Sequence, residues 1–142
     1  MEIKKKITNA FQYTTNISKA GLVAIFVSAR CKSNEDLRVE INGLRFREIP
    51  PEKNVQLFNI PPAFNGSKLK GLKKMVVFLT VLDIDKHTIS LIPRNSAFIE
   101  EIEVQELAGK QDLEIEIKNE AEDGDRRPWI TFVLIDLPLK SL

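Results

Sequence analysis

The sequence predicts an all-β fold, an antiparallel β-sandwich, on three observations. Several segments alternate polar and apolar residues with a period of two, as strands with one wet face do. Three runs of strand length are almost entirely apolar and rich in Val, Ile and Phe. Helical periodicity is nearly absent. The chain has 142 residues, and we expect a single domain over residues 1–142, because this length supports one core and leaves little room for two.

The alternating segments predict the strands that have one face in water. Residues 36–43 alternate and end at Asn42-Gly43, a pair that accepts positive φ and marks a tight turn. Residues 99–104 and 112–118 repeat the alternation. Such strands must bury their apolar faces against a second layer, and this need predicts two stacked sheets.

The apolar runs predict central strands that are shielded on both faces. They cover residues 22–29, 75–82 and 129–137. Residues 83–86 separate the second run from the strand-like residues 87–92, and this spacing predicts a hairpin with a four-residue loop.

Residues 44–72 contain two Ile-Pro-Pro triplets and predict a long irregular connection. One short helix is expected inside it, over residues 51–58, where Pro51 suits the first turn.

Charge and composition exclude several classes of function. The 21 basic and 20 acidic residues leave a net charge of +1, so no global field draws the chain to nucleic acid or to an anionic membrane. One cysteine and one histidine rule out an intrachain disulfide, a Cys-rich zinc site and a two-histidine metal motif. The longest apolar run, residues 21–29, is far shorter than the ~20 residues that span a bilayer.

The lysines at positions 4–6 are not followed by the apolar run of roughly 7–15 residues that a secretory signal needs. The location of the protein therefore stays open. It is cytosolic as the chain stands, or extracellular or at the cell surface if the chain is cut from a longer exported protein.

His87 and Cys31 are the residues that most invite a catalytic interpretation. His87 could be a general base or a metal ligand, but no Ser, Cys or Asp stands at a spacing that would orient its ring. Cys31 lacks the helix N-terminus or paired histidine that would activate a thiol. We therefore expect His87 to lie at a strand end with its ring bonded to a nearby carbonyl, and Cys31 to be a buried or strand-end thiol. We also expect no enzymatic activity and no cofactor.

The most polar segment, residues 120–127, holds the weak candidates for a metal site. Its carboxylates Glu122, Asp123 and Asp125 could contribute oxygens to Ca²⁺, which takes about 6–8 of them. The EF-hand spacing is absent and two arginines follow directly, so a solvated turn between strands is the expected structure. A bound calcium ion is the alternative.

Two aromatic residues beside polar side chains are the candidate ligand-binding groups. Trp129 follows Arg126 and Arg127; exposed, it offers a flat face to a sugar or a peptide, and buried, it caps the sandwich beneath an arginine. Phe64 precedes Asn65 in the long connection, and loops on a rigid sandwich often carry binding residues. The alternative is that Phe64 folds inward and anchors the loop.

Five segments occur in an order that is known from one family. They are residues 11–30, residues 37–43, Phe64-Asn65-Gly66, residues 75–92 with Lys86-His87-Thr88-Ile89 at the turn, and residues 99–104. In this order they resemble non-catalytic carbohydrate-binding modules of the galactose-binding-like jelly-roll type, over roughly residues 7–107. In that family an asparagine just before the late strand bonds to the sugar; this sequence departs from the pattern, with Phe98 at the comparable place and Asn95 three residues earlier.

The resemblance implies a jelly-roll sandwich that binds a poly- or oligosaccharide without catalysis, as an accessory module of a larger protein. We expect stacking on Phe64 or Trp129, with hydroxyl contacts from Asn65, Arg126 and Arg127.

The alternative from another class is a protein-interaction or assembly domain without sugar binding. Such a domain presents a sheet face or a sheet edge to its partner, and a homodimer would be one form of it. The surplus of apolar strand at residues 129–139 favours this alternative.

Overall fold

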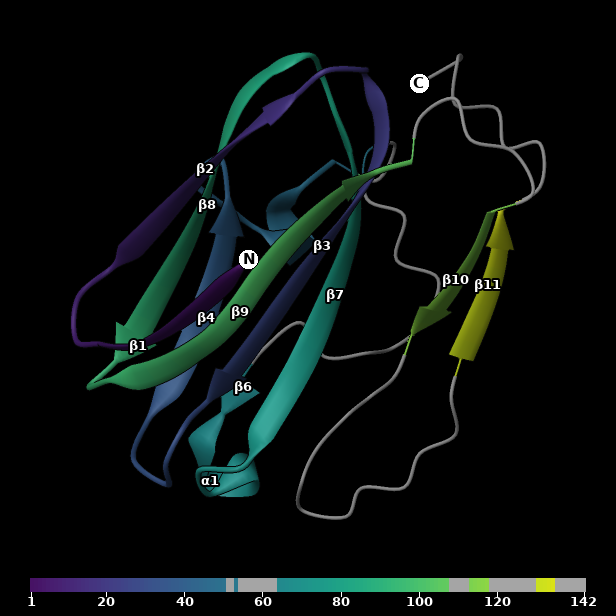
Figure 1. Ribbon diagram of the computed structural model, residues 1–142. Helices are drawn as coiled ribbons and strands as arrows, with labels where there is room; N and C mark the ends of the chain where they lie inside the picture. The colour runs from purple at the N-terminus through teal and green to yellow at the C-terminus, as the bar shows by residue number, and fades with distance from the viewer. Residues whose placement is uncertain (51–52, 54–63, 108–112, 118–129, 135–142) are drawn as a thin grey trace.

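The computed structural model describes residues 1–50, 53, 64–107, 113–117 and 130–134. Most of these residues lie in strands (Figure 1). The strands are β1 (Glu2–Ile7), β2 (Phe11–Ile17), β3 (Gly21–Arg30), β4 (Asp36–Ile41), β5 (Leu44–Arg45), β6 (Phe64–Asn65), β7 (Lys73–Leu82), β8 (Asp85–Arg94), β9 (Ala97–Glu106), β10 (Leu113–Ile117) and β11 (Ile130–Leu134). The described helices are a 3-10 helix, η1 (Phe46–Glu48), and α1 (Gly66–Leu69); neither is long and apolar enough to cross a membrane.

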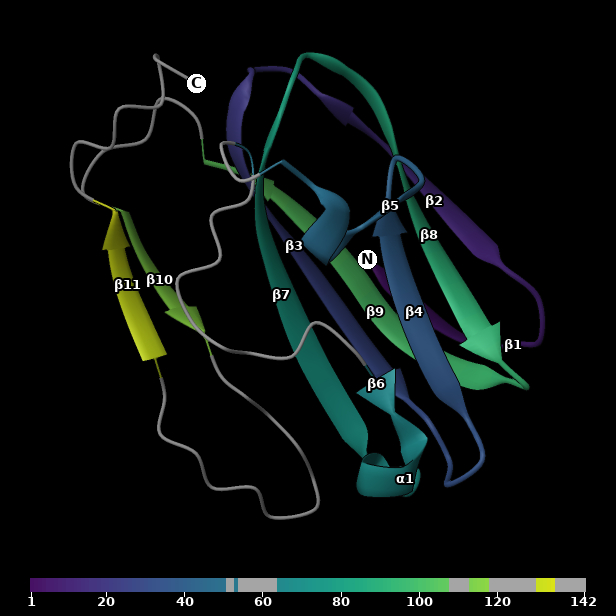
Figure 2. The ribbon, with the colours of Figure 1, turned by 180° about the vertical axis from the view of Figure 1, so that it is seen from behind.

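Two antiparallel sheets lie face to face, one in front of the other in Figures 1 and 2. The first sheet has the strand order β1-β9-β3-β7 and the second β2-β8-β4-β5, with β6 also paired to β4. From β1 to β4 the chain changes sheet at every connection, and it does so again between β7, β8 and β9. This is the strand order of a jelly roll, so the predicted all-β antiparallel sandwich is confirmed.

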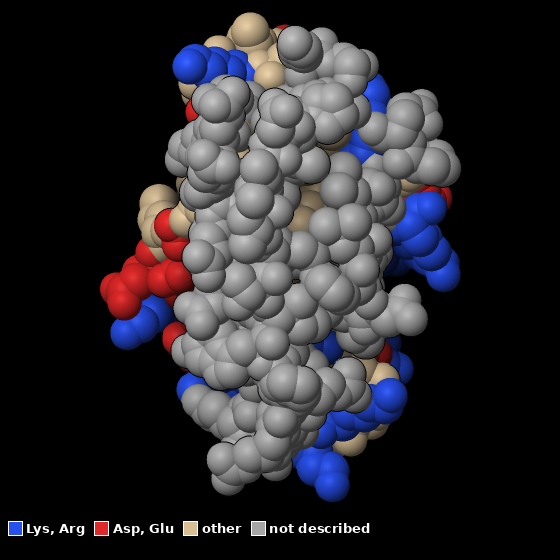
Figure 3. Space-filling model, turned by 90° about the vertical axis from the view of Figure 1, so that its right-hand side faces the viewer, with Lys and Arg blue, Asp and Glu red and all other residues tan. Residues whose placement is uncertain are grey.

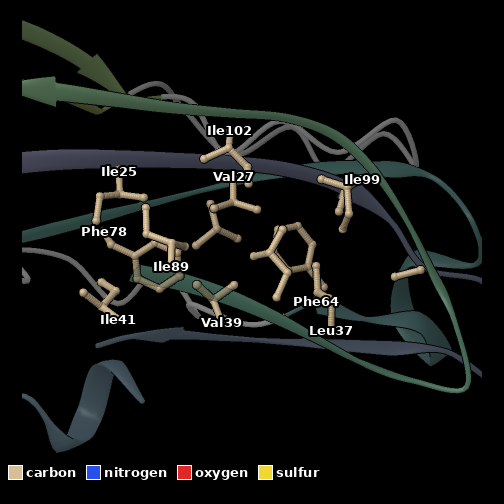
Figure 4. Close-up of a cluster of buried hydrophobic side chains, with 14 of the residues drawn as sticks. Ile25, Val27, Leu37, Val39, Ile41, Phe64, Phe78, Ile89, Ile99 and Ile102 are labelled. Carbon is tan, nitrogen blue, oxygen red and sulfur yellow. The ribbon is translucent and has the colours of Figure 1, made fainter. Parts of the chain in front are cut away.

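The core fills the space between the two sheets, where side chains from both point toward one another (Figure 4). Ile25, Val27 and Phe78 enter it from the first sheet, and Val39 and Ile89 enter it from the second; each is at most 3% exposed. Burying a side chain of this size contributes about 1.5–3 kcal/mol. Packing between the sheets is therefore the main source of stability.

The prediction of a central strand over residues 22–29 is confirmed. These residues form most of β3, which lies between β9 and β7. Val23 and Val27 belong to the core between the sheets, and Leu22 and Ala24, on the opposite face of β3, are at most 1% exposed. Both faces of the strand are thus shielded, as its composition indicates.

The hairpin predicted for residues 75–92 is wrong. β7 pairs with β3 in the first sheet, whereas β8 pairs with β2 and β4 in the second. Residues 83–84 therefore carry the chain from one sheet to the other. The physical reason is that Phe78 and Ile89 fill the same core from opposite sides (Figure 4), which two neighbouring strands of one sheet cannot do.

The predictions of central strands over residues 75–82 and 129–137 are not confirmed. β7 is the last strand of the first sheet, and β11 pairs with β10 in a separate two-stranded sheet. In β7, Leu79 and Val81 are 5% and 7% exposed although they lie outside the core between the sheets. A strand buried on both faces can thus still be an edge strand, and composition alone does not separate the two cases.

The predicted turn at Asn42-Gly43 is confirmed. The two residues have φ angles of 52° and 81° and join β4 to β5, as expected for a two-residue hairpin with positive φ at both positions. The helix expected over residues 51–58 falls outside the described residues, apart from Lys53.

Candidate functional site

Several of the predicted site residues lie outside the described part of the chain. They include the ligand-binding candidates Arg126, Arg127 and Trp129. The calcium-ligand candidates lie outside it too: Glu122, Asp123 and Asp125. Their roles stay predictions.

Phe64 is a core residue. Its side chain is 1% exposed and packs in the cluster between the sheets (Figure 4), while its backbone pairs with Leu37 of β4. The alternative expectation, an inward anchor, describes this structure, and the ring presents no face on which a sugar could stack. Asn65 is exposed and caps α1, because its Oδ1 accepts hydrogen bonds from the amide and hydroxyl of Ser67 at 3.1 and 2.7 Å.

A pocket of about 410 Å³ opens at the end of the sandwich where β3 ends and β9 begins. This volume falls in the range of small-molecule sites, about 300–1,000 Å³. Its lining includes one aromatic ring, three basic and two acidic side chains, and we call it the Phe98 pocket. These side chains are Lys6, Arg30, Lys32, Glu35, Phe98 and Glu100; the chain at Gly71 and Ala97 completes the lining.

Strand register explains why the ring and two of the basic groups meet. Phe98 of β9 lies opposite Lys6 of β1 on one side and Arg30 of β3 on the other. Their strand neighbours Ile7 and Ile99 are buried in the core. Because side chains alternate along a strand, Lys6, Phe98 and Arg30 form a row on the outer face of the first sheet. The Phe98 side chain is partly exposed there.

A β-bulge places a carboxylate beside this row. The pairing of β9 with β3 shifts between Ile99 and Glu101, so Glu100 is the extra residue. Its Oε1 accepts a hydrogen bond from Arg30 Nε at 2.7 Å, and Arg30 Nη1 also contacts the carbonyl of Gly71 at 3.5 Å. Bulges commonly redirect side chains next to functional sites. Here the bulge holds Arg30 between a carboxylate and a backbone carbonyl.

Glu35 ties together two loops at the pocket end of the sandwich. Its Oε1 accepts a hydrogen bond from the Lys32 amide at 2.7 Å, and its Oε2 accepts one from the hydroxyl of Ser96 in the β8–β9 turn. Burial, at 7% exposure, would by itself raise the pKa of Glu35. These two hydrogen bonds, with the positive charges of Lys32 and Lys6, outweigh burial and hold the pKa below its usual value. Glu35 is therefore ionised at neutral pH.

The segment around α1 closes the same end of the molecule, at the bottom of Figures 1 and 2. The amide of Gly66 donates to the carbonyl of Glu35 at 2.9 Å, and the amide of Gly71 donates to the carbonyl of Cys31 at 2.7 Å. A Cβ at Gly66 would lie 1.9 Å from the Lys32 oxygen. Only glycine allows the two backbones to approach this closely.

Basic side chains are visible on several parts of the surface drawn in Figure 3, including its lower end, where α1 lies in Figure 1. The lining of the pocket contains three basic side chains and two carboxylates. The pocket therefore offers donors from lysine and arginine and acceptors from glutamate around a single ring.

His87 and Cys31 have structural roles. The ring nitrogens of His87 lie 2.8 Å from Asn42 Nδ2 and 2.7 Å from the carbonyl of Asp83. The ring thus bridges the β4–β5 turn and the β7–β8 connection. Cys31 is fully buried; burial first, and then the negative charges of Glu35 and Asp36, raise its pKa to about 12. Within the described residues, no three His, Cys, Asp or Glu side chains come together as a metal site would need.

Sequence reasoning missed the Phe98 pocket, although one signal was present. In residues 97–106 the outward positions are mostly acidic, and Phe98 is an aromatic residue among them. Single exposed apolar side chains are common on protein surfaces, so this signal alone does not mark a site, and only the pocket around the ring does so. A search against protein-family models and a search of curated proteins both find no match to the chain.

Proposed function

We propose that this chain is a non-catalytic carbohydrate-binding domain and that the Phe98 pocket holds one sugar unit of an oligo- or polysaccharide. The observation that carries the proposal is the partly exposed ring of Phe98 in a pocket with both donors and acceptors. The resemblance of residues 7–107 to galactose-binding-like modules supports it, because that stretch contains nearly all of the pocket lining.

The ring would recognise the apolar face of the sugar. Axial C–H groups of a pyranose carry partial positive charge, and the face of an aromatic ring is negative. Strand pairing on both sides holds the backbone of Phe98 between Lys6 and Arg30, so no backbone ordering is needed on binding.

The charged side chains would recognise the hydroxyl groups. Each hydroxyl both donates and accepts, so it can bind to a lining that contains both lysine donors and carboxylate acceptors. Arg30 and Glu100 already form a hydrogen-bonded pair, and a sugar hydroxyl can bridge such a pair without leaving a charge unpaired. Lys6 and Lys32 also line the pocket and supply further donors.

The test is a glycan array probed with the folded chain, followed by calorimetric titration of the soluble ligands that bind. We expect Phe98→Ala to weaken binding at least about tenfold, which is about 1.4 kcal/mol. The matched control is Phe26→Ala, since Phe26 is a partly exposed ring of the same sheet that does not line the pocket. An array without any hit, or equal affinities for the two variants, would overturn the proposal.

The same titration tests the predicted contacts of the last part of the chain. If Trp129 also contacts the sugar, Trp129→Ala weakens binding in addition to Phe98→Ala. An unchanged affinity assigns recognition to the Phe98 pocket alone.

A further inference from the structure

The two sheets end in strands that differ in how well their open edges are protected. Natural proteins protect such edges with lysines, bulges or a covering segment, because unpaired backbone groups recruit other strands. In the first sheet, β1 carries Lys4, Lys5 and Lys6, and its pairing with β9 contains a bulge, with a φ of 48° at Lys4. β7 is the strand at the other end of the first sheet. Its edge is partly covered by a neighbouring segment, because the amide of Val81 donates to the carbonyl of Lys53 at 2.8 Å.

Within the described part of the chain, β2, at the end of the second sheet, has none of these devices. Its seven residues, Phe11–Ile17, contain no charge and no proline. Its register with β8 is unbroken along the whole strand. Within the described residues, no backbone group outside β8 pairs with it. Among the residues that the structure describes, the amides and carbonyls of its second edge therefore have no backbone partner.

The side chains of β2 also suit pairing with a further strand. Gln12, Thr14 and Asn16 are exposed, polar and uncharged. Between them, Phe11 and Tyr13 are partly buried and pack against the core. A strand added at this edge would thus extend both the apolar inner face and the polar outer face of the sheet.

We propose that the partner of this edge is the β2 strand of a second copy of the chain, paired antiparallel about a two-fold axis at Thr14. In this register Gln12 meets Asn16 of the second copy, Tyr13 meets Thr15, and Phe11 meets Ile17. A pair of one aromatic and one β-branched residue, as in the last two contacts, is favourable across antiparallel strands. One surface serves both copies, as in other two-fold dimers.

Charge explains why β2 and not β1 forms this contact. Two β1 strands paired about their centre would place Lys4 opposite Lys5 of the other copy, which is destabilising. In the β2 pair, Lys5 lies over the ring of Phe11 at 5.6 Å. In this register Phe11 lies opposite Ile17 of the second copy, so the two Phe11 residues are six positions apart along the strands. At about 3.3 Å per residue this separates the two copies of Lys5 by about 20 Å. This exceeds the screening length of about 8 Å at physiological salt.

The first test is sedimentation or light scattering of the whole chain, at concentrations up to about 1 mM. We expect a concentration-dependent dimer. Thr14→Lys places two lysines opposite each other on the axis and should leave a folded monomer, because Thr14 is exposed. Gln105→Lys is the matched control: it adds the same charge at an exposed position of β9, which is paired on both sides, and should remain dimeric. A monomeric wild type, or a dimer that survives Thr14→Lys, would overturn the proposal.

The second test concerns the register. Gln12→Lys combined with Asn16→Glu places opposite charges across the proposed interface twice, so the dimer should persist and weaken as salt is added. Gln12→Lys combined with Asn16→Lys places like charges there and should give a monomer. If both double variants are monomeric, or both dimeric with equal affinity, the pairing about Thr14 is excluded.

Discussion

At the scale of single residues, the carboxylate of Glu35 holds two loops of the pocket end together. It accepts one hydrogen bond from the loop after β3 and one from the β8–β9 turn, and its pKa lies below the usual value. A group with a lowered pKa in the folded state stabilises the protein above its unfolded pKa, and this contribution is lost as the pH falls through its folded pKa.

Glu35→Gln is therefore expected to lower the free energy of unfolding by about 1–3 kcal/mol at pH 7. The deficit should shrink as the pH falls below the usual glutamate range, because the wild type then loses the same charge. Thermal unfolding between pH 7 and about pH 3 measures both effects. Glu103→Gln, at an exposed position of β9, serves as the control and should have little effect. An equal deficit at every pH would contradict the role assigned to the charge.

Cys31 makes a second prediction at this scale. Because the thiol is fully buried and its pKa is raised to about 12, it should not react with a thiol reagent in the native protein. It should react fully in urea, because unfolding exposes the thiol. The chain has one cysteine, so all labelling comes from Cys31. Slow native labelling would report opening of the pocket end. Rapid native labelling would show that the thiol is not enclosed as described.

At the scale of elements, two glycines contrast in what they contribute. Gly43 is marked in the sequence by Asn42-Gly43 and has a φ of 81°, but a Cβ there meets nothing within 4 Å. Gly66 also follows an asparagine, Asn65, but a Cβ there would lie about 2 Å from the carbonyl oxygens of Lys32 and Glu35. Its constraint comes from a neighbouring loop and not from its own φ.

We expect Gly66→Ala to cost about 3 kcal/mol or more, because backbone must move to relieve the contact. Gly43→Ala should cost only about 1 kcal/mol, the strain of a positive φ. Urea unfolding curves of the two variants give the comparison. If Gly43→Ala were the more damaging change, the close approach at Gly66 would be refuted.

At the scale of the whole molecule, the jelly roll brings distant segments to one core and to one pocket. Phe64 comes from the long connection yet fills the core together with strands of both sheets (Figure 4). Lys6, Arg30 and Phe98 lie far apart in sequence and form one row only because β1, β9 and β3 are neighbours.

Phe64→Ala should therefore destabilise the fold by about 3–5 kcal/mol, as removal of a buried aromatic ring does. Among molecules that remain folded at low temperature, the affinity for any sugar should be unchanged. Thermal unfolding and a calorimetric titration give the two measurements. Loss of affinity without loss of stability would return Phe64 to the binding site.

Local patterns carried the fold class but not the strand order. The alternation in residues 36–43 and the Asn42-Gly43 pair predicted β4 and its turn, because both depend on neighbouring residues. The hairpin expected at residues 83–86 was wrong, because sheet membership depends on partners elsewhere in the chain. The candidate site shows the same limit, since the loops of Glu35, Gly66 and Ser96 meet only in the folded molecule.

The sequence was sufficient to predict antiparallel strands in two layers, because a period of two and apolar runs of strand length are local features that depend only on neighbouring residues. Packing in three dimensions sets which strands are neighbours, buries Phe64 and places Phe98 in a pocket between Lys6 and Arg30. Those outcomes rest on contacts between segments far apart in the chain, and these contacts form only when the two sheets pack.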